Sequence, residues 1–180
     1  SSPECEYQFS HQLLQEAAYL SCPRDVRVSI HRQVVSLIEE RFPIWISRHP
    51  GDFATHLRRS GHYARGARYF ELAAREALKV SANRTALKMA DEGLASLRQV
   101  EDSAEREISL LTVRGQAAFA MEGHASPTAH ESFVRARDLL ATQQDEADDE
   151  SDLEQRFLVK WGLWVGCSQR HAHADAFSLA

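Results

Sequence analysis

The chain has 180 residues, of which 43% are hydrophobic and 26% are charged, and its formal net charge is −5. This length and apolar content allow one or two compact domains, and no apolar run approaches the roughly 20 residues that a membrane span needs. Residues 1–100 carry 14 Lys and Arg against 11 Asp and Glu, whereas residues 101–180 carry 7 against 15, without a dense basic stripe of the kind that binds nucleic acid.

We therefore expect neither a nucleic-acid partner nor a membrane partner. Three cysteines, an odd number without any C-x-x-C pair, predict a reduced, cytoplasmic protein with no disulfide framework. Ala, Leu, Arg and Glu are abundant, Pro and Gly are few, and no run alternates apolar with polar residues. These features predict an all-α fold.

Apolar residues at steps of three and four predict the first helices. They cover residues 11–20, capped by Ser10, then 24–41, and then 52–59, with an irregular link over 44–50. In the first helix the residues expected to face inward are Leu13, Leu14, Ala17 and Ala18. In the second they are Val26, Ile30, Val34, Leu37 and Ile38.

Paired helices follow from residue 62. We expect them over residues 62–80, over 84–97 with Asn83 as its N-cap, over 105–121, and from Pro127 with Ser126 as its N-cap. Residues 145–154 contain seven acidic side chains and are predicted to be a solvated linker. A fifth helix is expected over 153–167, and a sixth from about residue 171. The expected inward residues of the first four are Ala67, Phe70, Ala74, Ala77 and Leu78; Ala86, Ala90, Gly93 and Leu94; Ile108, Leu111, Gly115 and Ala118; and Ala129, Phe133, Ala136 and Leu140.

An internal repeat links three of these helices. Residues at spacings of four and three recur with first positions 86, 129 and 173, which are 43 and 44 residues apart. The three sets are Ala86, Ala90 and Gly93; Ala129, Phe133 and Ala136; and His173, Phe177 and Ala180. A small-aromatic-small pattern is typical of the second helix of a tetratricopeptide repeat, whose usual period is about 34 residues. Alternatively, unrelated amphipathic helices can be aligned on the same spacing.

No phosphate-binding loop or catalytic motif is found, so we expect no enzymatic activity, no catalytic residue and no cofactor. His171 and His173 face different ways on a helix, which argues against a metal site. Cys167 has His171 four residues away, but an inert buried cysteine is the simpler interpretation. The acidic linker lacks the glycine-centred loop of a calcium site.

Aromatic residues recur on the fifth predicted helix at spacings of four and three. Phe157, Trp161 and Trp164, together with Phe177, are candidates either for packing between hairpins or for an interaction surface. Because the last predicted hairpin stops at residue 180, we also expect either self-association through this C-terminal edge or fraying of that hairpin.

Five segments resemble, in the same order, the C-terminal region of bacterial adenylate/guanylate cyclase-type signalling ATPases. They are residues 7–19 (YQFSHQLLQEAAY), residues 27–43 with its Arg27, Ile30-His31-Arg32 and EERFP elements, residues 75–83 (REALKVSAN), residues 123–139 (GHASP…FVRARDL) and residues 161–164 (WGLW). The chain departs from the family pattern at Leu57, where an aromatic residue is usual, and at His173, where a small one is. No catalytic residue of the family falls within these segments.

The resemblance implies a piece of a much larger protein in which an AAA-like ATPase is followed by a tetratricopeptide array. We therefore expect antiparallel helical hairpins stacked as a tetratricopeptide-like right-handed superhelix (61–180, the last repeat truncated), preceded by a small helical segment (1–60). The expected function is a non-catalytic regulatory module that binds a protein partner and acts on the upstream ATPase. The alternatives are a structural or oligomerisation scaffold, the sensor region of a kinase- or transcription-regulator-fused ATPase, and a fragment of an enzyme.

Overall fold

The computed structural model describes residues 12–101, 103–142 and 150–169, and in these residues every regular element is an α-helix. The all-α prediction is confirmed. The described helices are α1 (Gln12–Ser21), α2 (Arg24–Arg41), α3 (Pro43–Arg48), α4 (Pro50–Arg59), α5 (Tyr63–Lys79), α6 (Asn83–Leu97), α7 (Ala104–Glu122), α8 (Pro127–Thr142) and α9 (Glu150–Gln169). The sixth helix of the paired region, expected from about residue 171, and the cap Ser10 lie outside the described residues.

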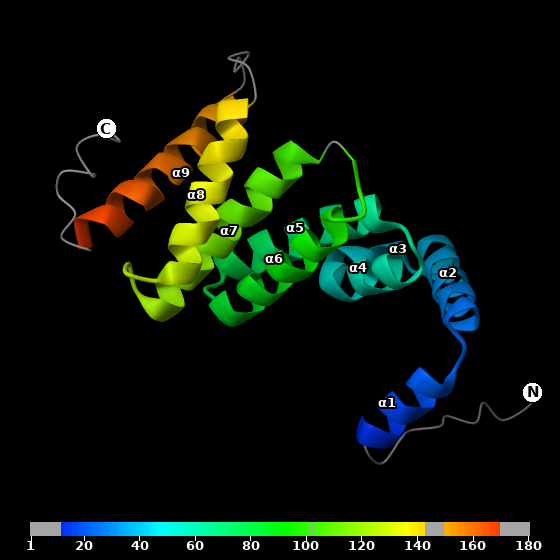
Figure 1. Ribbon diagram of the computed structural model, residues 1–180. Coiled ribbons are helices and arrows are strands. Elements are labelled where there is room, and N and C mark those ends of the chain that lie inside the picture. The colour runs from blue at the N-terminus through cyan, green and yellow to red at the C-terminus, as the bar shows by residue number, and fades with distance from the viewer. Residues whose placement is uncertain (1–11, 102, 143–149, 170–180) are drawn as a thin grey trace, which may run out of the picture.

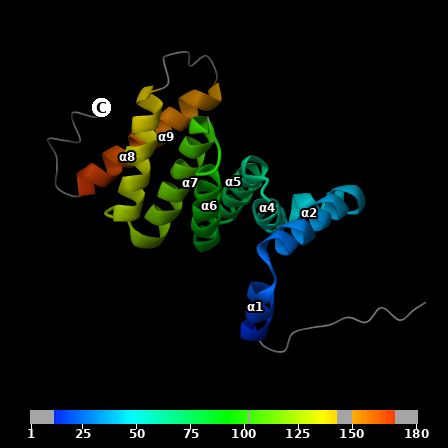
Figure 2. The same ribbon diagram turned by 45° about the vertical axis from the view of Figure 1, so that its right-hand side comes forward.

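Helices α4 to α9 form a row in which each helix packs on the one before it (Figure 1). Helix α5 also contacts α7, and α7 contacts α9, so the odd-numbered helices lie together along one side of the row. Figure 2 shows the same order from another direction, with α1 projecting away from the row. The boundary expected between residues 60 and 61 falls in the turn between α4 and α5, two helices that pack closely on each other.

Two glycines permit the close packing of α4 on α5, one in the turn between them and one in their contact. Gly61 has a φ of +89° and forms the turn after α4, where the His62 N–H donates to the Leu57 carbonyl at 2.9 Å. A Cβ on Gly66 of α5 would lie 3.3 Å from the backbone nitrogen of Arg58, so α4 and α5 touch backbone to backbone. A side chain at this position would require the backbone of α4 to shift, so glycine permits the approach without strain.

Helix α7 is the centre of the apolar core. Its residues Ile108, Leu111 and Ala118 pack in one cluster with α8 and α9, while Leu110 and Val113 pack in another with α5 and α6. Two faces of α7 are therefore buried in the two clusters. The face between them, which carries Ser109, Thr112 and Gln116, belongs to neither cluster. The inward residues expected for α5 to α8 are buried, apart from Leu78 and Leu94, which are half-buried.

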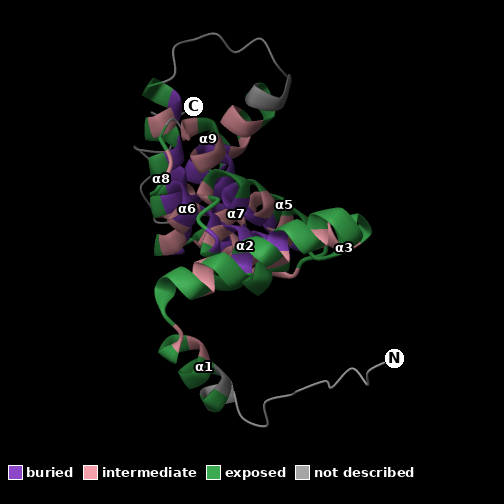
Figure 3. Cartoon of the chain, turned by 90° about the vertical axis from the view of Figure 1, so that its right-hand side faces the viewer, coloured by how far each residue is buried: buried purple, intermediate pink, exposed green. Residues whose placement is uncertain are grey.

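The expected inward faces of the first two helices are wrong in part. Val34 and Ile38 of the predicted face of α2 are half-buried, and Ile38 packs against Val35, but the other predicted residues that the structure describes are exposed. In α2, Val26, Ile30 and Leu37 are exposed, and the buried residues are His31 and Val35. The reason is that α4, with a smaller contribution from α3, packs on only one side of α2. In α1, Leu14, Ala17 and Ala18 are exposed as well, because this helix has little of the chain packed against it. Figure 3 shows the buried residues gathered in the row of later helices, while α1 and much of α2 are coloured as exposed.

Three local predictions have different outcomes. Ser126 caps α8 as expected, since its Oγ accepts the Ala129 N–H at 3.1 Å. The N-cap of α6 is Ala82 rather than Asn83, which is the first helical residue. The link expected over 44–50 is wrong, because Pro43 and Pro50 each begin a helix at the position where a missing N–H is tolerated.

Candidate functional site

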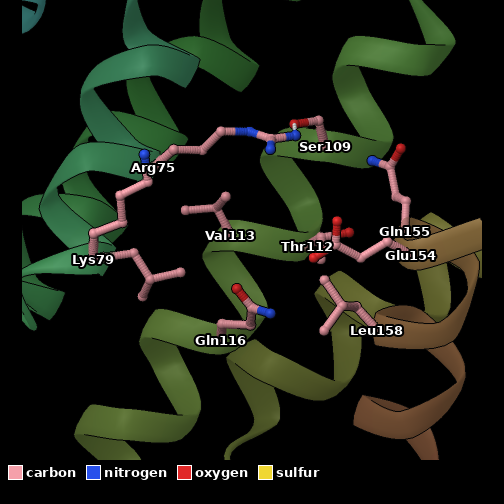
Figure 4. A pocket seen from close by; sticks show the side chains of 10 residues that line it. Arg75, Lys79, Ser109, Thr112, Val113, Gln116, Glu154, Gln155 and Leu158 are labelled. Carbon is pink, nitrogen blue, oxygen red and sulfur yellow. Dashed lines mark hydrogen bonds between the residues drawn. The ribbon is translucent and has the colours of Figure 1, made fainter. Parts of the chain in front are cut away.

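A groove runs across the odd-numbered helices and has a volume of about 410 Å³. Figure 4 shows side chains from α5, α7 and α9 facing one another around it. Its lining residues are Arg75, Leu78 and Lys79 of α5; Ser109, Thr112, Val113 and Gln116 of α7; and Glu154, Gln155 and Leu158 of α9. Each helix contributes residues separated by one, three, four or seven positions, which places them on one helix face.

The wall of the groove on α7 is the third face of that helix. Ser109, Thr112 and Gln116 lie between the two buried faces described above. The Thr112 hydroxyl donates to the Ile108 carbonyl of its own helix at 2.8 Å, which leaves its methyl group for the groove. The groove is therefore built by packing that holds α5 and α9 on either side of α7.

A polar network closes one end of the groove. Glu71 of α5 accepts a hydrogen bond from Ser109 Oγ at 2.5 Å and forms ion pairs with Arg75 and Arg106. Arg75 also donates to Ser109 Oγ at 2.8 Å. Because one carboxylate is shared by two guanidinium groups, this end keeps a positive charge. Lys79 adds a second cation nearby, although it is paired with Glu76 at 3.1 Å.

The opposite wall provides an amide without a partner. Gln155 Nε2 is buried and has no hydrogen-bond partner among the described residues. Next to it, Leu158 and, across the groove, Val113 supply apolar surface (Figure 4), and Leu78 also lines the groove. An extended polypeptide offers both carbonyl oxygens and apolar side chains, so it suits a site that combines an unpaired donor with an apolar floor.

The aromatic candidates do not lie in this groove. Phe157 is 64% exposed, Trp161 40% and Trp164 48%, so none of them packs in the core. Helix α9 packs instead through Val159, Gly162, Leu163 and Gly166 on another face. These three residues do not pack against the described helices, and the sixth predicted helix, which would complete the hairpin with α9, lies outside the described residues. Phe177 lies outside the described residues.

The residues of the first two repeat sets have a structural place. Ala86, Ala90 and Gly93 of α6 are buried, as are Ala129, Phe133 and Ala136 of α8. These helices lie behind α5 and α7 and hold the groove helices in position. The third set, residues 173, 177 and 180, lies outside the described residues.

The sequence analysis did not identify the groove. Its signal is the polar stripe of Ser109, Thr112 and Gln116, whose spacing marks a helix face between two apolar faces. Glu154 is the last residue of the acidic segment predicted to be a linker, but residues 150–154 belong to α9, and Gln155 carries no pattern of its own. The contributions of three helices become visible only in the folded chain.

The described residues also bear on metal binding, on membrane spanning and on the state of their cysteines. In the described part of the chain, no three His, Cys, Asp or Glu side chains are grouped so that they could hold a metal ion. No described helix is both long enough and apolar enough to cross a bilayer. Cys22 and Cys167 are free thiols of intermediate exposure.

Comparison of the chain with protein-family models, with curated proteins and with solved structures gave no match.

Proposed function

We propose that this chain is a regulatory protein-interaction module, built from tetratricopeptide-like hairpins, within a larger signalling ATPase of the cyclase-associated type. The observation that carries the proposal is the groove formed by α5, α7 and α9. Arrays of helical hairpins use such extended surfaces to bind other proteins. In itself the module has no catalytic role in this proposal.

The repeat sets support the tetratricopeptide-like arrangement. Phe133 and the small residues around it occupy the contact between α8 and both neighbouring odd-numbered helices, as the larger residue of a hairpin array does. Pairing α5 with α6 and α7 with α8 gives two hairpins, and α9 begins a third. The resemblance described above supplies the signalling ATPase as the parent protein.

The groove can couple binding to regulation because its walls belong to three different hairpins. A polypeptide bound there contacts helices of three different hairpins, so its affinity depends on how the hairpins are stacked. A partner changes the state of an attached module only by binding one stacking arrangement better than another. The exposed apolar stripe of α2, Val26, Ile30 and Leu37, is the surface that we assign to the upstream ATPase module.

The test uses peptides selected from a random display library on the immobilised chain. Gln116 is half-buried in the groove, and Gln116→Arg introduces both bulk and charge there. We expect this change to weaken the selected peptides by about tenfold or more. The matched control is Gln99→Arg, at an exposed position after α6, which should leave the affinity within about twofold.

Selected peptides that bind both variants equally would remove the groove from the proposal. A scaffold is the second candidate function, because the exposed aromatic residues of α9 suit contact with another copy of the chain. A chain that selects no peptides but associates through α9 would favour the scaffold.

A further inference from the structure

A second cavity, of about 330 Å³, lies beside the junction of α1 and α2 and is also lined by residues of α4, α5 and α6. It is lined by four arginines, by two tyrosines and by small or apolar residues, and none of the described residues lining it is acidic. The charged and aromatic lining residues are Tyr19, Arg24, Arg27, Arg58, Arg59 and Tyr63. This cavity is separate from the groove between α5, α7 and α9.

Three of the four arginines form no ion pair with the residues that the structure describes. Arg58 forms an ion pair with Glu92 at 2.7 Å. Arg24, Arg27 and Arg59 have no carboxylate partner among the residues that the structure describes. Like charges held close together raise the free energy of the folded chain unless an anion offsets them.

The Tyr19 ring holds two of these arginines together. The guanidinium carbon of Arg27 lies 4.9 Å from the centroid of the ring, and that of Arg59 lies 5.1 Å from it. A cation above an aromatic ring is attracted to the ring quadrupole, but its charge is not neutralised. Arg27 and Arg59 come from α2 and α4, so the ring gathers charges that are 32 positions apart in the chain.

Two guanidinium N–H groups at this cavity lack acceptors. Arg27 Nε and Arg58 Nε are buried, and neither has a hydrogen-bond partner in the described part of the chain. A buried donor without an acceptor costs free energy that a bound acceptor recovers. Guanidinium groups bind phosphate oxygens through paired N–H donors.

The positive field also reaches two neighbouring histidines. Burial lowers the pKa of His31, and the charges of His56, Arg59 and Arg27 lower it further. Burial and Arg59 likewise lower the pKa of His56, although Asp52 acts in the opposite direction. These shifts agree with uncompensated arginine charge at the junction.

We propose that this cavity binds a small polyphosphate anion through Arg24, Arg27 and Arg59. Three unpaired cations favour an anion of charge −2 or more over a single carboxylate. The small volume of the cavity, which is lined by residues of α1, α2, α4, α5 and α6, suits a di- or triphosphate group. A free inorganic polyphosphate and the phosphate chain of a nucleotide share this chemistry.

The test is a calorimetric titration of the 180-residue chain with inorganic pyrophosphate at physiological salt. We expect saturable binding at one site per chain. Arg59→Gln and Arg24→Gln should each weaken binding by about tenfold or more, because each removes a charge-assisted donor. Arg24 and Arg59 are exposed, so the folded structure tolerates both changes. A parallel titration with ATP distinguishes the two sources: tighter binding than pyrophosphate identifies a nucleotide, and equal binding identifies the phosphate chain alone.

The matched control is Arg84→Gln, which removes the same charge from an exposed site in the first turn of α6. Arg84 is about 16 Å along the helix from Ala95, which lines the cavity. It should change the affinity by less than about twofold. The side-chain Nε–H resonance of Arg27 should also shift on addition of pyrophosphate. Absence of saturable binding, or an equal effect of Arg84→Gln, would overturn the proposal, since diffuse positive charge would then explain any association.

Discussion

Phe133 of α8 lies so close to Gly162 of α9 that a Cβ at position 162 would come within 2.6 Å of the ring atoms Cε2 and Cζ. The same ring lies against Gly115 of α7, where an added Cβ would also come within 2.6 Å. One aromatic side chain therefore occupies the space left by two glycines on neighbouring helices. This contact fixes the distance between α7 and α9, the two helices that form most of the groove.

Gly162→Ala is expected to destabilise the fold even though alanine favours helices. The added methyl group must displace the fully buried ring of Phe133, and such overpacking costs about 1–3 kcal/mol. The control is Gly166→Ala in the same helix, where the nearest atom would be 3.7 Å away. That change should stabilise the chain by up to about 1 kcal/mol, because only the helix preference acts. Urea unfolding of both variants gives the comparison, and a stable Gly162→Ala variant would contradict the described packing.

Phe133→Ala should remove the same contact from the other side. Phe133 is fully buried, and loss of such a side chain costs about 3–5 kcal/mol. Glu131→Ala, two residues earlier and exposed, should change the free energy of unfolding by no more than about 0.5 kcal/mol. Thermal and urea unfolding measure both values. Similar small effects of the two substitutions would mean that the face of α8 is assigned incorrectly.

A chain of hydrogen bonds at the α1–α2 junction predicts acid sensitivity. Tyr19 Oη lies 3.0 Å from His31 Nε2, and His31 Nδ1 lies 3.0 Å from His56 Nδ1. Burial lowers the pKa of both imidazoles below the ordinary value of 6.5. The charges of His56, Arg59 and Arg27 lower the pKa of His31 further, and Arg59 lowers that of His56 against the opposing effect of Asp52. Below pH 6.5 the unfolded chain binds protons that the folded chain does not, so the free energy of unfolding decreases. The stability contribution is present above pH 6.5 and is lost as the pH falls through the lowered folded pKa values.

Urea midpoints measured between pH 8 and pH 5 test this expectation. His56→Asn should reduce the pH dependence, since it removes one of the two coupled imidazoles. His124→Gln is the control, at an exposed histidine after α7. A pH profile in which His56→Asn and His124→Gln have the same effect would show that the junction does not control the acid response.

The buried face of a helix is predictable from its sequence when other helices pack on several of its sides. Helices α5 to α8 have neighbours on two or more sides, so most of their apolar residues had to be inward, and the predicted faces agree. Helix α2 carries two apolar stripes, one with Val26, Ile30 and Leu37 and one around Val35. Which stripe is buried depends on α4, whose position is set by contacts distant in the sequence.

The candidate sites were less predictable than the fold for a related reason. Residues such as Gln116 and Gln155 are ordinary polar residues of helices, and only the packing of α5, α7 and α9 brings them to one groove. Likewise, Arg27 and Arg59 resemble any solvated arginines until the Tyr19 ring places them together. Hydrophobic periodicity reports which face is buried, but it carries no information on which polar groups from different helices meet.

The exposed aromatic residues of α9 predict self-association of the chain. Phe157, Trp161 and Trp164 follow one another at helical spacing on a face that no described helix covers. Neighbouring exposed aromatic side chains tend to be buried by a partner, because the transfer of apolar surface out of water is favourable. We expect the average sedimentation coefficient to increase with protein concentration over the micromolar range. Trp161→Glu should abolish this increase, since a carboxylate at the centre of the patch opposes its burial.

Val80→Glu supplies the matched control for this experiment. Val80 is an exposed apolar residue at the C-terminus of α5, away from α9, so the substitution adds the same charge without changing the aromatic patch. It should leave the concentration dependence unchanged. Hydrogen exchange tests the same association. Exchange of the Trp161 and Trp164 indole N–H groups should be slower at high protein concentration, because the interface would protect them from water. A chain that sediments as a monomer at every concentration, with both indoles exchanging freely, would show that this face needs no partner.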